Sequence, residues 1–208
     1  MRFILLFSIF FGLSVNAQDI NSVFISMPDS LSPILTKVNR QDFSDFLSSG
    51  MKAVVKNKFD GKSEMLKLTD DYLLLKTTSV SLEEMKLLPL NDSVNVVCVV
   101  NTYSGPAEDS KVSFYTTDWK ELPLSDFIKL PDYKDFYKSQ NDSINSVSID
   151  DFTMDMPVMK ANLSSNDNDI VFKITSFEAM DKETAEKLKP YTADSLNYKW
   201  VDGTFVKE

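Results

Sequence analysis

Adjacent pairs of carboxylates are the residues of this sequence with the clearest capacity for chemistry. The pairs are Asp70-Asp71, Glu83-Glu84 and Asp150-Asp151. A glycosidase needs two carboxyl groups that face each other about 5 to 9.5 Å apart. Neighbouring side chains on a β-strand point to opposite faces, and Asp70-Asp71 stands in an expected turn, so none of these pairs should converge on one substrate. We interpret them as solvated acids and predict no catalytic residue.

The chain contains no histidine, and Cys98 is its only cysteine. The lack of histidine excludes Ser-His and Cys-His nucleophile pairs and removes the commonest zinc ligand. Cys98 lies within the apolar run from Val94 to Val100, where we expect a small buried hydrophobe and not a nucleophile. A single cysteine also allows no intramolecular disulfide, so stability has to come from the core.

Metal and cofactor motifs are weak in this sequence. Clustered oxygens occur at residues 166–169 and at Asp150, Asp151 and Asp155, but neither stretch has the spacing, glycine and final bidentate acid of a calcium loop. We interpret both as turns, with bound calcium as the less favoured alternative. The five glycines form no phosphate-binding loop. No cofactor and no metal are therefore predicted.

Aromatic residues are the remaining candidates for a binding surface. They include Tyr103, Tyr115, Trp119, Tyr133, Phe136, Tyr137 and Trp200. Aromatic residues interleaved with strands more often pack in the core or at sheet edges than line a carbohydrate or protein surface. We expect the greatest exposure at Trp119, Tyr133, Phe136 and Tyr137, which form the candidate partner surface.

Two helices are expected near the N-terminus, where they would cover a sheet. Ser32-Pro33 predicts a short helix through Val38, and Asn39 predicts the cap of a second helix that ends at Gly50.

From Ala53 the hydrophobic period changes to two, which predicts an antiparallel meander. The expected strands span residues 54–59, 65–69, 72–78, 82–88, 94–100 and 112–116, with a loop at 102–109. Asp60-Gly61 is a strong hairpin signal. The unbroken apolar run 96–100 predicts a central strand that is covered on both faces, by the N-terminal helix on one of them.

Residues 138–150 are polar and rich in turn formers, which predicts a linker between a first unit, 18–137, and a smaller unit, 151–208. In the second unit we expect strands at 152–163 and 170–176, a helix at 182–189 capped by Asp181, and a hairpin at 198–206. Stretches 109–118 and 194–202 look alike. An internal duplication and two unrelated hairpins both explain that likeness.

The first 17 residues have the layout of a cleavable secretory signal. Arg2 precedes an apolar run of about ten residues, half of the roughly 20 that a membrane-spanning helix needs. Val15 and Ala17 are the small residues that a signal peptidase requires, so the mature chain should begin at Gln18, without a retained membrane span. Removal of Arg2 changes the net charge from -9 to -10. Nucleic acid and anionic membrane are consequently poor partners for this chain.

Four stretches prompt a comparison with a known family: 27–35 (MPDSLSPIL), 62–73 (KSEMLKLTDDYL), 85–89 (MKLLP) and 114–120 (FYTTDWK). Through them the chain resembles an uncharacterised family of exported proteins from Bacteroidales bacteria, catalogued as a domain of unknown function. The resemblance implies a source and a compartment, and it supplies no mechanism and no site. Such bacteria attach glycans to Ser or Thr in Asp-Ser/Thr-apolar sequences. Ser30, Ser93, Ser143 and Ser195 fit that pattern, and Ser143 in the expected linker is favoured. The alternative is that Asp-Ser simply forms good turns.

The sequence therefore predicts an α+β fold, in which antiparallel β-meander sheets carry a few short helices on one face. The favoured function is that of a monomeric periplasmic or secreted binding or accessory protein without catalysis, whose partner is another envelope protein or a glycan. A carboxylate-based enzyme acting on a glycan or other envelope substrate is one alternative, and a structural envelope component is another.

Overall fold

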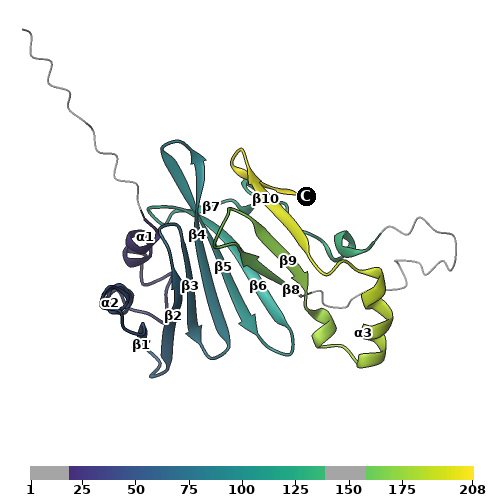
Figure 1. The fold of residues 1–208 in the computed structure, drawn as a ribbon, viewed down its shortest axis with the longest axis horizontal. Helices are drawn as coiled ribbons and strands as arrows, with labels where there is room; N and C mark the ends of the chain where they lie inside the picture. The colour runs from purple at the N-terminus through teal and green to yellow at the C-terminus, as the bar shows by residue number, and fades with distance from the viewer. Residues whose placement is uncertain (1–18, 139–157) are drawn as a thin grey trace, which may run out of the picture.

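The computed structural model describes residues 19–138 and 158–208. These residues form two antiparallel sheets with short helices, which confirms the α+β class (Figure 1). The expected signal, residues 1–17, lies outside the described residues, as does most of the expected linker. Within the described ranges, no helix is long and apolar enough to cross a membrane.

The first sheet has seven strands that follow one another in sequence order. They are β1 (Val54–Lys56), β2 (Lys62–Leu68), β3 (Tyr72–Thr78), β4 (Ser81–Asn91), β5 (Val94–Ser104), β6 (Glu108–Thr116) and β7 (Glu121–Leu122). The expected meander is thus confirmed, but the loop expected at 102–109 is wrong. Strands β5 and β6 continue through this polar stretch because its side chains pair across the strands, as Thr102 Oγ1 and Ser110 Oγ do at 2.7 Å.

The two N-terminal helices differ from the expected ones. Helix α1 (Ile20–Ser26) was not expected, and the short helix expected from Ser32-Pro33 is wrong, because residues 32–36 form no helix. Helix α2 (Lys37–Ser48) corresponds to the second expected helix and begins before Asn39. Thr36, not Asn39, is the cap of α2: Thr36 Oγ1 accepts a hydrogen bond from the Asn39 backbone N–H, and Asn39 Oδ1 accepts one from the Thr36 N–H, both at 3.1 Å. Gly50, with a φ of 68°, follows the helix in the left-handed region, as expected near a helix end.

Strand β5 is buried on both faces, as its apolar run predicts. Val97 and Val99 pack into a core with α1 and α2, whereas Val96, Cys98 and Val100 pack into a second core with the smaller sheet. The large sheet is therefore the middle layer of the molecule. Alternate side chains of one strand serve two separate cores.

The second sheet has four strands in the order β11-β10-β9-β8. The strands are β8 (Met159–Leu163), β9 (Ile170–Ile174), β10 (Leu196–Val201) and β11 (Thr204–Lys207), with helix α3 (Lys182–Leu188) between β9 and β10. Asp181 caps α3 as predicted, since its carboxylate accepts the Thr184 backbone N–H at 3.0 Å. Short 3-10 helices occur at Leu124–Asp126, Tyr133–Phe136, Ser176–Glu178 and Lys189–Tyr191.

Candidate functional site

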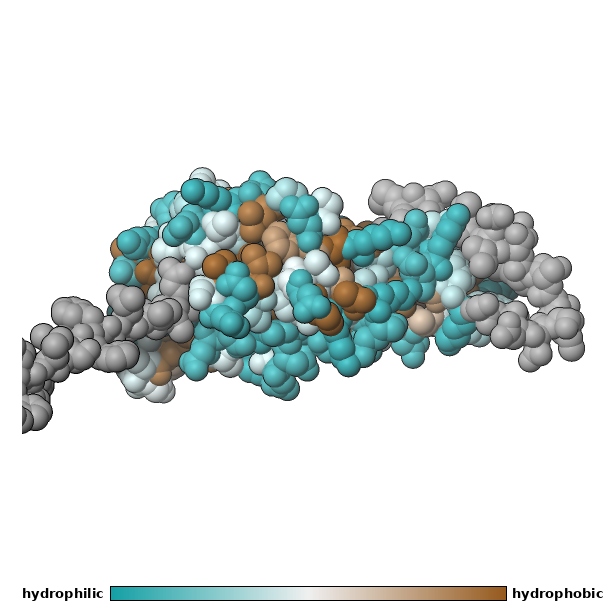
Figure 2. Space-filling model, turned by 90° about the horizontal axis from the view of Figure 1, so that it is seen from above, coloured by the Kyte–Doolittle hydropathy of each residue, from teal (hydrophilic) through white to brown (hydrophobic). Residues whose placement is uncertain are grey.

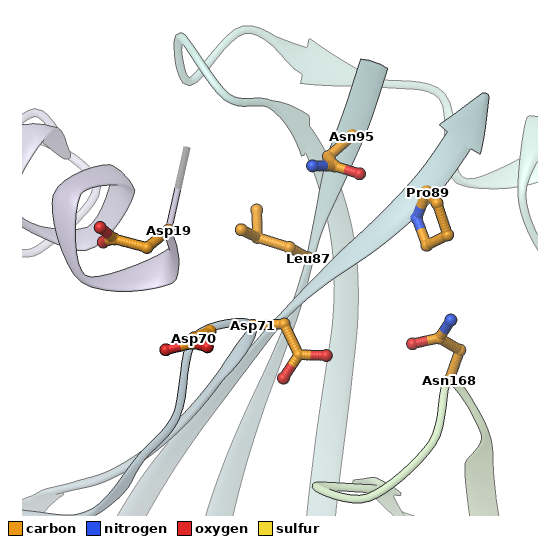
Figure 3. A pocket seen from close by; sticks show the side chains of 7 residues that line it. All are labelled: Asp19, Asp70, Asp71, Leu87, Pro89, Asn95 and Asn168. Carbon is orange, nitrogen blue, oxygen red and sulfur yellow. The ribbon is translucent and has the colours of Figure 1, made fainter. Parts of the chain in front are cut away.

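A pocket of about 480 Å³ lies at the end of the molecule where the β4–β5 hairpin projects beyond the sheet (Figures 1 and 3). Its lining residues are Asp19, Asp70, Asp71, Leu87, Pro89, Asn95 and Asn168. They come from the start of α1, the β2–β3 turn, the β4–β5 hairpin and the β8–β9 turn. Segments that are far apart in the sequence thus meet around one space.

The pocket exists because β4 is longer than β3 at this end. Strand β3 begins at Tyr72, which pairs with Lys86. One residue further, the Leu87 N–H still donates to the Asp71 carbonyl at 2.8 Å. Beyond this point β4 has no partner on the β3 side. Leu87 and Pro89 therefore form an apolar wall, and Figure 3 shows Leu87 projecting toward the side of Asp19.

The open edge of β4 is blocked at Pro89. Backbone groups of alternate residues in a strand point to the same edge, so Pro89 follows Leu87 on the edge that β3 leaves free. Proline has no N–H to offer another strand. Its carbonyl accepts the indole N–H of Trp200, from β10, at 2.8 Å. A proline within a strand pattern is the one sequence signal that marks this edge.

The three carboxylates of the pocket have different roles. Asp19 caps α1, because its carboxylate accepts the Ser22 N–H at 2.7 Å, and Figure 3 shows it pointing away from Leu87. Asp71 pairs with Lys86 Nζ at 2.8 Å. Burial acts to raise the pKa of Asp71, but hydrogen bonds from Lys86 and Thr69 outweigh burial and hold that pKa below its usual value. Asp70 is exposed, and its backbone carbonyl accepts the Ile20 N–H.

Glu84 does not line the pocket and lies between the two sheets. It is 4% exposed, and it accepts hydrogen bonds from the Tyr72 hydroxyl at 2.7 Å and from the Asn162 amide at 3.3 Å. Burial raises the pKa of Glu84, and hydrogen bonds oppose the rise only in part. Our interpretation of Glu84 as a solvated acid is wrong, because the second sheet covers this position.

Glu83 faces the opposite side of β4 and is buried as well, so the solvated interpretation is also wrong there. It is 8% exposed on the side of the N-terminal helices. Burial raises the pKa of Glu83 to about 7, against the opposing charge of Arg40. The expectation that neighbouring acids on a strand do not converge is confirmed for this pair. Asp150-Asp151 lies outside the described residues.

The aromatic residues of the candidate partner surface lie in two different places. Trp119 is 8% exposed and packs in the core of α1 and α2, where its indole N–H donates to the Val23 carbonyl at 2.9 Å. Phe136 is fully buried in the other core. Exposure of these two residues was wrongly predicted. Tyr133 and Tyr137 are half-buried and pack edge to face, with their ring centres 6.2 Å apart.

The serines expected to carry glycans lie in turns or beside strands where they are described. Ser30 and Ser93 are exposed, Ser195 is half-buried, and Ser143 lies outside the described residues.

Cys98 is fully buried, as predicted, and burial raises the pKa of its thiol. Residues 166–169 form the predicted turn between β8 and β9. In the described ranges, His, Cys, Asp and Glu form no group of three that could hold a metal ion.

Comparisons with known proteins give a family and a fold. The model of a family described as "Protein of unknown function (DUF3256)" matches residues 12–205. One solved structure, of a domain of an uncharacterized protein from Porphyromonas gingivalis W83, is similar at 28% sequence identity and a TM-score of 0.78. The similarity covers 90% of this chain and 96% of that chain. No curated protein matches the sequence.

Proposed function

The chain belongs to the DUF3256 family of proteins of unknown function, and we propose that it is exported and acts as a non-catalytic binding or accessory protein, periplasmic or secreted. The layout of residues 1–17 supports export. The expected partner is another envelope protein or a glycan, bound by a monomer of this acidic chain.

The state of the acids around the pocket is the observation that carries the binding role. A general acid that works near neutral pH needs a raised pKa. In the pocket, the pKa of Asp71 is lowered, and the carboxylate of Asp19 is engaged as a helix cap. The buried acids Glu83 and Glu84, whose pKa values are raised, face opposite sides of β4 and do not line the pocket. Burial and the charge of Asp167 also raise the pKa of Asp169, which is next to Asn168 in the sequence but does not itself line the pocket. This arrangement favours binding over the alternative of a carboxylate-based enzyme.

Cross-linking in intact cells of the native organism tests the binding role. The protein is captured after cross-linking, and mass spectrometry identifies and quantifies what is attached to it. We expect one envelope component to return repeatedly, in an amount near that of the protein. Capture without cross-linker, and capture of an unrelated acidic exported protein, serve as controls. Repeated recovery of the protein alone would contradict the proposal.

A further inference from the structure

We infer that the partner carries a segment that is both basic and apolar, and that this segment docks at the pocket and the adjacent hairpin tips. This inference rests on the proposed binding function. We use the name hairpin face for the pocket residues together with Leu90, Val94 and Val201. The negative charge of this surface disfavours three other occupants: a second copy of the chain, a nucleic acid and an anionic membrane.

Three exposed apolar side chains belong to the tips of two adjacent hairpins. Leu90 is 41% exposed, and Val94 and Val201 are each 47% exposed. Leu90 and Val94 stand at the turn of β4–β5, and Val201 at the turn of β10–β11. These turns touch, because a Cβ at Gly203 would lie 2.8 Å from Leu90 Cδ1. Figure 2 shows this end of the molecule with apolar surface in its middle and hydrophilic surface around it.

The apolar tips lie next to the pocket along β4. Leu90 directly follows Pro89, which lines the pocket together with Leu87. Because neighbouring side chains of a strand point to opposite faces, Leu90 lies on the other face of β4, beside Gly203. The Trp200 indole fixes the two hairpins to each other through its hydrogen bond to the Pro89 carbonyl. A docked segment would thus meet apolar side chains on both faces of the β4 overhang, which both sheets hold in place. Such preorganisation lowers the entropy cost of binding.

Acidic groups lie around the pocket and in the adjacent turns, and the charge of Lys199 acts on two of them, Asp167 and Asp169. Asp19, Asp70 and Asp71 line the pocket, Asp167 and Asp169 flank Asn168, and Asp92 and Asp202 stand in the two turns. Lys86 neutralises Asp71, whereas within residues 19–138 and 158–208 no ion pair engages Asp19 or Asp70. Lysine and arginine side chains complement such a rim.

The same charge argues against the other occupants. A second copy of the chain would bring another acidic face, at a net charge of -9 for the whole sequence. Nucleic acid and anionic lipid are repelled in the same way. Addition of a strand to the free edge of β4 is blocked, because Pro89 offers no N–H and its carbonyl is already bonded to Trp200. The segment therefore docks through its side chains.

A binding titration with a defined probe tests the inference. The probe is a fluorescent peptide of alternating lysine and leucine, and its glutamate-for-lysine counterpart is the reference. The protein is the mature chain, residues 18–208, and anisotropy is read at low and at moderate salt. We expect the lysine peptide alone to bind, and Asp70→Lys and Val94→Ser each to weaken binding about tenfold, the equivalent of about 1.4 kcal/mol.

Matched controls separate the hairpin face from general charge and hydrophobicity. Glu186→Lys changes the net charge as Asp70→Lys does, but it lies on α3. Val80→Ser removes a valine that is 55% exposed in the β3–β4 turn, at the other end of the strands. Weakening by Asp70→Lys and Val94→Ser that merely equals that of their controls overturns the inference.

The cross-linking experiment, repeated with these variants, separates the two proposals. We expect the native partner to be lost from Asp70→Lys and Val94→Ser and kept by the controls. A partner that returns equally with all four variants overturns the hairpin face and leaves the binding function standing. A protein that returns alone in every version overturns the binding function itself.

Discussion

The hydroxyl of Tyr72 donates a 2.7 Å hydrogen bond to Glu84 Oε1, on the face of the large sheet that the small sheet covers. Both residues belong to the large sheet, whereas Asn162, the other donor to Glu84, belongs to β8 of the small sheet. A buried carboxylate that depends on donors from two sheets ties their packing together. Removal of either hydrogen-bond donor to Glu84 should therefore destabilise the whole fold.

Tyr72→Phe should lower the free energy of unfolding by about 1 to 3 kcal/mol, because it leaves one buried oxygen of Glu84 without its donor. Urea denaturation measures the change as a lower midpoint at an unchanged slope. Tyr103→Phe is the matched control, since Tyr103 is 58% exposed. Equal midpoints for Tyr72→Phe and the control would show that the hydrogen bond contributes nothing net.

Glu83→Gln should stabilise the protein at pH 8 and have little effect at pH 4. Burial raises the pKa of Glu83 from 4.5 to about 7, so the folded state holds a proton there that the unfolded state loses above pH 4.5. Stability therefore falls as pH rises through this window, by up to about 3 kcal/mol above pH 7. The glutamine side chain of Glu83→Gln does not ionise, so the variant should not show this fall in stability. Denaturant midpoints at several pH values, with the exposed Glu178→Gln as control, measure it. If the denaturant midpoint of Glu83→Gln depends on pH as that of the unchanged protein does, the prediction is wrong.

Gly203→Ala should destabilise the protein by about 1 kcal/mol or more, because an alanine at this position pays the cost of the left-handed backbone region. Gly203 has a φ of 84°, and a Cβ there would also lie 2.8 Å from Leu90 Cδ1. The melting temperature should drop by about 2 to 4 °C for each kcal/mol in a chain of this size. Gly105→Ala, whose Cβ would lie 3.6 Å from the nearest atom, is the control. Similar melting of both variants would rule out the contact between the two turns.

Glycosylation of the native protein should appear as extra mass on the mature chain, with Ser143 as the favoured position. Ser30 and Ser93 are the exposed alternatives among the described residues, and Ser195 is half-buried. Intact-mass measurement of protein from its native organism, followed by peptide mapping, checks this. A mass equal to that of the unmodified mature chain ends the hypothesis.

Local signals in the sequence predicted those parts of the fold that depend on local physics. The run Tyr72–Thr78 forms β3 with the expected bounds, and Asp202-Gly203 forms the expected turn of the final hairpin. The apolar run of β5 correctly predicted a strand with two covered faces. Each of these signals lies within a few residues of the structure that it specifies.

The remaining features depend on contacts between distant segments. Helix α1 has the sequence INSVFIS, which local propensity does not favour as a helix, and it is held by Asp19, by Asp70 and by Trp119, which is 96 residues away from Val23 in the chain. The burial of Glu83 and Glu84 depends on which elements cover each face of β4. The pocket depends on the unequal lengths of β3 and β4 at one end, and no periodicity encodes that difference.

The lack of a backbone N–H at Pro89 also affects the tendency of the protein to aggregate at high concentration. An exposed hairpin with a free strand edge is a template on which other chains polymerise into fibrils. Here the overhanging part of β4 exposes apolar side chains while its edge offers no free donor at Pro89 and a carbonyl that is already bonded. The molecule can therefore expose apolar side chains at the tip of the β4–β5 hairpin and still resist growth into ordered aggregates.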